Sequence, residues 1–97
     1  MIRQSNEHSM KEAIDAFLES KKMKGKLAEM NIIEKWETLV GAMIAKNTKQ
    51  LYFKDGKLFI HVDSPVLRQE LYYSRTRIID IINKEAGGDL INEVVMR

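Results

Sequence analysis

The sequence predicts an α+β fold, a two-layer α/β sandwich in which helices pack on a three-stranded sheet, in the order α-α-β-β-α-β. Apolar residues recur at helical spacing over two stretches in the first half of the chain. Two apolar runs then flank Asp55-Gly56, a pair typical of a tight hairpin turn. A third helical pattern follows, and the chain ends on a short apolar run. Helices that interleave with so few strands are expected to share one core with a single sheet.

Length and composition fit one soluble domain. A chain of 97 residues can bury one modest core. Residues 1–8 show no periodicity, so we expect a flexible tail before a single domain over residues 9–97. Cysteine is absent, which fits a reducing compartment. The sequence shows no signal segment and no apolar run of membrane-spanning length, so we expect a cytoplasmic protein without membrane contact.

The first helix is predicted to begin at Ser9, because Ser9 and Glu12 match a capping box. Apolar residues recur every three or four positions after it. The lysine-rich stretch KKMKGK, residues 21–26, is predicted to connect this helix to the next, with Gly25 as the breaker.

A second helix is predicted from about Leu27 to Ala45, and a break near Asn31 is also compatible with the pattern. Trp36 lies on its apolar stripe, which favours a core anchor over a stacking platform. Gly41 lies inside this helix, where glycine costs about 1 kcal/mol relative to alanine. A glycine at this position would be explained by close packing on another backbone, by a kink, or by a close approach needed for function. We favour close packing.

The Asp55-Gly56 turn determines the register of the predicted hairpin, because both central positions of a type I′ turn need a positive φ. Tyr52 should then face Phe59, and Lys54 should face Lys57. The other predicted pairs are Phe53 with Leu58, Leu51 with Ile60, and Gln50 with His61. Side chains alternate across a strand, so one face is apolar and the other carries both rings. The two opposed lysines either cost a small amount of stability or bind an anion.

Ser64-Pro65 predicts the start of the third helix, with serine as N-cap and proline at the first helical position. Gly87-Gly88 predicts its end. The stretch after the glycines, LINEVVMR, alternates partly and is predicted to form the last strand.

The predicted core combines the apolar stripes of the helices with the inner face of the hairpin. Its predicted members are Trp36, Gly41, Leu51, Phe53, Leu58, Ile60, Leu71 and Ile78. The six methionines, which include Met10, Met23 and Met30, would suit an adaptable docking surface or fill gaps in the core. We favour the core.

Residues that could support catalysis or bind a metal do not cluster in the sequence. The two histidines, His8 and His61, share no ligand spacing with other candidate ligands, and His61 is expected on the surface of a strand. Nucleophile motifs and glycine-rich phosphate loops are absent, and Ser64 is explained as a helix cap. We therefore expect a protein that is not an enzyme and uses no metal, cofactor or small-molecule substrate.

One candidate binding surface is the solvent face of the hairpin, where Tyr52 and Phe59 would lie side by side among lysines. Aromatic rings on a sheet with flanking cations stack unpaired bases in several modules. The alternative is that the first helix packs over this face and buries both rings. The candidate nucleic-acid contacts over the whole chain are Lys21, Lys22, Lys24, Lys26, Lys46, Lys49, Lys54, Lys57, Arg68, Arg75, Arg77, Tyr52 and Phe59.

A second candidate surface is the basic edge of the third helix together with residues 21–26 and Lys46. These cations could line a groove that tracks phosphates. The alternative is a solvated helix face, because Glu70, Asp80 and Glu85 interleave with the basic residues.

A set of motifs spread over residues 10–97 resembles the DciA family. The first motif, W-x-x-x-V-G-x-x-I-A-x-N-T, consists of Trp36, Val40, Gly41, Ile44, Ala45, Asn47 and Thr48. The motifs that follow are the strand pattern D-G-x-L-x-I-x-V over 55–62, a helix start over 64–71, an isoleucine-rich run over 78–82, and N-x-x-x-G-G over 83–88.

The resemblance implies a domain similar to type II KH folds. It also implies a role in bacterial DNA replication, where proteins of this family associate with the replicative helicase and bind nucleic acid. The chain lacks the G-x-x-G loop by which KH domains clamp a nucleic-acid backbone, so its contacts, to DNA or to RNA, would come from other residues. The alternative function is a protein–protein adaptor that docks on a partner without touching nucleic acid.

Overall fold

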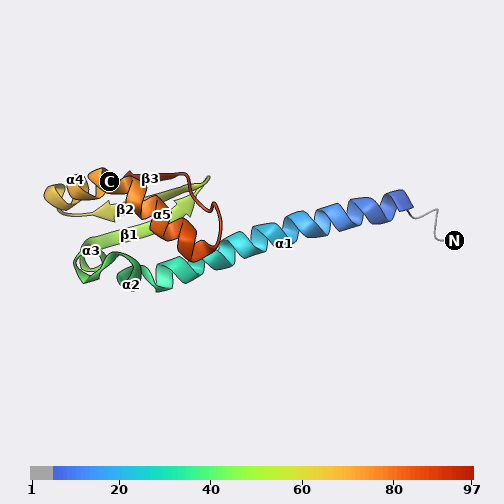
Figure 1. The fold of residues 1–97 in the computed structure, drawn as a ribbon, viewed down its shortest axis with the longest axis horizontal. Coiled ribbons are helices and arrows are strands. Elements are labelled where there is room, and N and C mark those ends of the chain that lie inside the picture. The colour runs from blue at the N-terminus through green and yellow to red at the C-terminus, as the bar shows by residue number, and fades with distance from the viewer. Residues whose placement is uncertain (1–5) are drawn as a thin grey trace.

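The computed structural model describes the backbone of residues 6–97 and the side chains of residues 9–97. A sheet with its packed helices forms a body from which one long helix projects (Figure 1). The principal extents of the molecule are 66 × 20 × 19 Å. The elements are α1 (Asn6–Glu34), α2 (Trp36–Val40), α3 (Ala42–Asn47), β1 (Thr48–Lys54), β2 (Lys57–Val62), α4 (Pro65–Tyr73), α5 (Arg75–Ala86) and β3 (Glu93–Met96).

The predicted α+β class and the order of helices and strands are confirmed. The three strands form one sheet in the order β1-β2-β3, with β1 antiparallel and β3 parallel to β2. The described chain has more helices than predicted, because the second helical segment is interrupted at Lys35 and Gly41 and the third at Ser74. The similarity to KH folds stays a prediction.

The helix α1 is continuous, so the predicted connection at residues 21–26 is wrong. Lysine and methionine are good helix formers, and one glycine costs only about 1 kcal/mol against a long helical run. The predicted start at Ser9 is also wrong, because α1 already includes residues 6–8. Residues 1–5 of the predicted tail lie outside the described residues.

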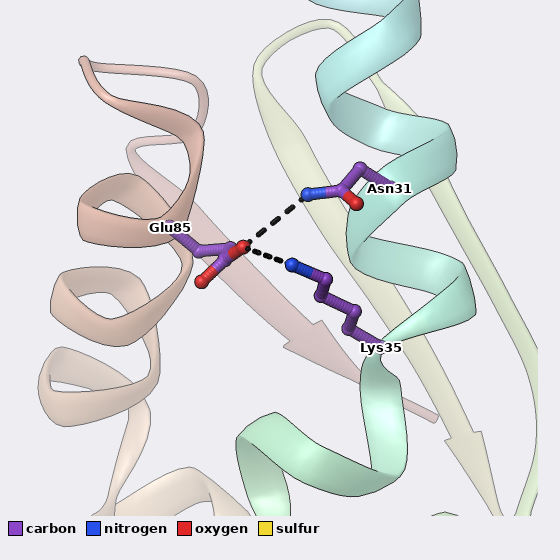
Figure 2. Close-up of polar contacts among 3 residues, drawn as sticks. All are labelled: Asn31, Lys35 and Glu85. Atoms are coloured by element: carbon purple, nitrogen blue, oxygen red, sulfur yellow. Dashed lines mark hydrogen bonds and ion pairs between the residues drawn. The ribbon is translucent and has the colours of Figure 1, made fainter.

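The C-terminal end of α1 is anchored to α5. Ile32 is fully buried in the core. Beside it, Glu85 Oε2 accepts from Asn31 Nδ2 at 3.3 Å and pairs with Lys35 Nζ at 3.2 Å (Figure 2). Residues 9–24 are all exposed, so the first part of α1 is an arm without tertiary contacts.

Gly41 separates α2 from α3 and is not a core residue. It has φ +98° and ψ 160°, a conformation that L residues rarely adopt. It is exposed, and among the described residues no atom beyond its two chain neighbours lies within 4 Å of where a Cβ would stand, so close packing is wrong and the kink is the correct interpretation. Trp36, by contrast, is 6% exposed and donates from Nε1 to Thr48 Oγ1 at 3.0 Å.

The hairpin has the predicted register. Tyr52 pairs with Phe59 and Lys54 with Lys57, and the other three predicted pairs are also found. Asp55 has φ +51° and Gly56 has φ +74°, as the turn requires. An irregularity in β1 between Thr48 and Gln50 interrupts the pairing near its start.

Asn83 holds the chain between α5 and β3. Its Oδ1 accepts from the backbone N–H groups of Leu90 at 3.0 Å and Ile91 at 2.9 Å, and its Nδ2 donates to the carbonyl of Ile91 at 2.8 Å. Gly87 ends α5, as predicted, and has the left-handed conformation that is common after the last residue of a helix. At the start of α4, Ser64 Oγ accepts from Leu67 N–H at 3.1 Å, as expected for an N-cap.

The core lies between one face of the sheet and the helices. Its buried members are Ile32, Trp36, Leu58, Ile60, Val62, Leu67, Leu71, Ile78, Ile82, Ile91 and Val94. Leu51 and Phe53 are partly buried and pack against this cluster. Met10, Met23 and Met30 are 66%, 64% and 61% exposed, so the prediction that they fill gaps in the core is wrong.

Candidate nucleic-acid interface

The outer face of the sheet carries a stacked aromatic pair. The rings of Tyr52 and Phe59 are 4.8 Å apart between centroids and inclined by only 6°. His61 lies 5.9 Å from Tyr52, and the guanidinium of Arg97 lies 5.2 Å from the centroid of Phe59. Offset stacking of this kind stabilises the pair while leaving the outer ring edges accessible. We call Tyr52, Phe59, His61 and Arg97 the aromatic face.

The helices leave the aromatic face uncovered. Each of the five described helices contributes to the cluster on the opposite face of the sheet, for example Ile32 from α1 and Leu71 from α4. Because strand side chains alternate, that cluster takes Leu58 and Ile60 from β2 and excludes Phe59. The rings are half-buried and stack on each other. The alternative in which the first helix covers both rings is not what the structure shows.

The lysines of the hairpin lie around the aromatic face. Lys57 pairs with Glu93 at 3.6 Å, and Lys49 pairs with Asp63 at 3.4 Å, both on exposed side chains. Lys54 is exposed, and within the part of the chain that the structure describes it has no carboxylate within ion-pair distance. Exposed ion pairs contribute little energy, so a phosphate can exchange for either carboxylate at small cost.

The four lysines of residues 21–26 lie on α1, three of them on the arm, and not on a loop. Spacings of three and four share a helix face, so Lys21 and Lys24 project from one side and Lys22 and Lys26 from another. The arm leaves the body at the end where the hairpin turn lies (Figure 1). Helix α3, which bears Lys46, lies at the far end of the long axis (Figure 1). The structure therefore does not bring residues 21–26, Lys46 and the third helical segment into one groove.

The arginines of α4 and α5 make local contacts. Arg68 Nη1 donates to the carbonyl of Val62 at 2.9 Å, which uses part of its guanidinium to hold the chain before α4. Arg75 lies 3.9 Å from the ring centroid of Tyr72 and donates to the carbonyl of the same residue at 2.7 Å. Arg77 is exposed and lies at a shallow apolar hollow between α3 and α5.

Sequence reasoning missed two exposed tyrosines at the end of α4. Tyr72 and Tyr73 are 51% and 72% exposed and line a groove between α4 and β3. The signal was present, because both lie off the apolar stripe of the helix and Arg75 follows Tyr73 by two residues. Adjacent aromatic and cationic residues on a solvent face are enriched in binding surfaces.

Over residues whose side chains are described, no group of three or more histidines or acidic residues could hold a metal ion. No helix within the described range is both long and apolar enough to cross a membrane. His61 Nε2 is buried without a hydrogen-bond partner among the described residues, which fits a ring held for packing against Tyr52.

The fold and surface define a small α+β domain with an open aromatic sheet face and a basic helical arm. The family model described as "Dna[CI] antecedent, DciA" matches residues 9–96, so the chain belongs to the DciA family, which is related to DNA replication in bacteria. The predicted resemblance is thereby confirmed. The chain is also similar to a UPF0232 protein of Corynebacterium glutamicum (strain R), at 36% identity over 63 residues. That match covers 65% of this chain and 35% of the relative, so it spans about a third of the relative's length.

Proposed function

We propose that this protein is a nucleic-acid-binding accessory protein of bacterial DNA replication, that it associates with the replicative helicase, and that it works in the cytoplasm. The observation that supports this best is the stacked pair of Tyr52 and Phe59 on a sheet face that no described helix covers. Family membership supports the connection to replication.

The aromatic face suits a single strand better than a duplex. Every base has a π face, so stacking on Tyr52 or Phe59 needs no particular sequence, whereas bases in a duplex are already stacked. Lys54, Lys57 and Arg97 surround the rings and would contact phosphates. Such contacts release counterions, so affinity should fall steeply with salt.

The test measures fluorescence anisotropy of a labelled single-stranded oligonucleotide. Stacking is worth about 1–3 kcal/mol per base, so Tyr52→Ala should weaken binding by roughly 5- to 150-fold. Tyr73→Ala is the matched control, because Tyr73 is an exposed tyrosine outside the aromatic face. An equal loss in both variants, or a larger loss in the control, would contradict the placement of the strand on the aromatic face.

The salt dependence separates phosphate contacts from stacking. Lys54→Ala should reduce the slope of log affinity against log salt by about 0.7, the value for one phosphate of a single strand. Tyr52→Ala should lower affinity and leave the slope unchanged. Binding that is insensitive to salt, or no binding of DNA or RNA at low salt, would reject the proposed function.

A second candidate function, a protein–protein adaptor, is favoured by the exposed apolar stripe of the arm. Met10, Ile14, Phe17 and Leu18 are 53–66% exposed and share one side of α1. The purified replicative helicase of the same organism is the probe, after nuclease treatment. Phe17→Ser should weaken its binding by about 30-fold or more, as expected for an interface hot spot. Met23→Ser, on another side of the arm, is the control, and equal binding by all three proteins would reject this role for the stripe.

A further inference from the structure

The strand β3 is an open edge of the sheet. Among the described residues, the order β1-β2-β3 leaves both β1 and β3 without a second neighbour. Edge strands are usually protected by bulges, lysines or proline. The β1 edge has such protection, with an irregularity between Thr48 and Gln50 and with exposed Lys49 and Lys54. The sequence of β3, EVVM, has no lysine or proline, and its pairing with β2 is regular.

The backbone of β3 presents hydrogen-bonding groups to the open side. The N–H of Arg97 donates to the carbonyl of Ile60 at 2.9 Å, and the carbonyl of Arg97 accepts from Val62 N–H at 3.0 Å. Arg97 therefore directs both backbone groups toward β2. Because these directions alternate along a strand, Val95 does the same, whereas Val94 and Met96 direct their N–H and C=O groups outward.

The space beside the edge is accessible. The groove between α4 and β3 runs along this strand and is lined by Tyr72 and Tyr73 as well as by residues 93–96. The two exposed tyrosines, which are not part of the core cluster, would gain a neighbour if another chain lay in this groove.

The edge is complementary to itself. In an antiparallel pair centred on Val95, Val94 of one copy lies opposite Met96 of the other, and these are the residues whose backbone groups point outward. Glu93 then lies opposite Arg97 of the second copy, on the same face of the sheet, and the pair occurs twice by symmetry. We propose that β3 pairs with β3 of a second copy of this chain and forms a continuous six-stranded sheet.

The pairing would place both aromatic faces on one side of the joined sheet. Residues 93, 95 and 97 lie on the outer face in both copies, because the two-fold axis is perpendicular to the sheet. This consequence rests on the proposed function, under which two sets of Tyr52 and Phe59 would then contact one strand. The pairing itself does not depend on nucleic acid, so it can hold or fail independently.

A cysteine at the two-fold axis tests the geometry. Val95 would lie opposite Val95 of the second copy in a non-hydrogen-bonded pair. Their Cα atoms would be about 4.5 Å apart, a distance that a disulfide can span. The chain has no cysteine, so Val95→Cys should form a covalent dimer under mild oxidation. Gln50→Cys, on the protected β1 edge, is the matched control and should stay monomeric.

Exchanging the charges of Glu93 and Arg97 tests the register of the pairing without a covalent link. Sedimentation equilibrium from about 1 µM to about 1 mM covers the affinities expected of so small an interface. Glu93→Arg and Arg97→Glu should each weaken association by about tenfold, and the double variant should restore it, because opposite charges face each other again. Circular dichroism checks that each variant is folded.

The proposal is overturned if wild-type protein stays monomeric over this range and Val95→Cys forms no more dimer than the control. It is also overturned if the double variant associates no better than the single ones. Loss of oligonucleotide binding in Tyr52→Ala without any change in association leaves the pairing supported.

Discussion

Replacing Asn83 by alanine should destabilise the protein more than any other single polar substitution that we consider. The change removes three hydrogen bonds to Leu90 and Ile91, at 2.8–3.0 Å. Each is worth about 0.5–1.5 kcal/mol, and Ile91 is 3% exposed, so water cannot easily replace the lost partner. We expect a loss of about 3 kcal/mol of unfolding free energy, or roughly 12–24 °C in Tm for a domain of this size.

The assay is urea unfolding followed by circular dichroism. Asn83→Asp keeps the acceptor for two N–H groups and loses the donor to the Ile91 carbonyl, so its stability should fall between wild type and alanine. Asn47→Ala is the control, because Asn47 donates one exposed bond to the Met43 carbonyl, and its effect should stay within about 0.5 kcal/mol. If Asn83→Ala unfolds within about 0.5 kcal/mol of wild type, the loop before β3 is held by something else and the reasoning is wrong.

Three further predictions concern the helices. Gly41→Ala should cost about 1–3 kcal/mol in urea unfolding, because its φ of +98° strains any side chain although the space is empty; a neutral result would mean that the kink relaxes. Ile32→Ala should lower the unfolding free energy by about 2–5 kcal/mol, because Ile32 is fully buried. Ile14→Ala on the same helix should lower it by less than about 0.5 kcal/mol, because Ile14 is 53% exposed. Similar losses in the two variants would show that the arm packs on the body. Amide hydrogen exchange should be fast over residues 9–24 and slow over 28–34, and uniform protection along α1 would contradict an unsupported arm.

The sequence predicted best those features that depend on near neighbours in the chain. The turn at Asp55-Gly56 determines the pairing of the whole hairpin, because each residue has one partner once the turn is set. Ser64 and Gly87 mark helix ends through bonds to backbone groups within one turn. These signals need no knowledge of the core.

The errors arose where a local preference was weak or where packing decided. Gly25 does not break the helix, because its cost of about 1 kcal/mol is easily exceeded by the good helix formers around it. A glycine inside a helical pattern, such as Gly41, indicates an unusual backbone site, but sequence alone does not distinguish a positive φ from a close contact. Whether helices cover one face of the sheet or both depends on long-range packing, which periodicity does not reveal.

The position of the arm bears on how the two proposed partners would be accommodated. Lys21–Lys26 lie on the part of α1 that is nearer to the body, while Phe17 and the rest of the apolar stripe lie farther out (Figure 1). The hairpin turn, with Lys54 and Lys57 beside it, lies at the same end of the body (Figure 1). A strand that left the aromatic face over this turn would meet the lysines of the arm before the stripe. Under the proposed function, nucleic acid and the helicase would therefore use different lengths of one helix, and binding of one need not displace the other.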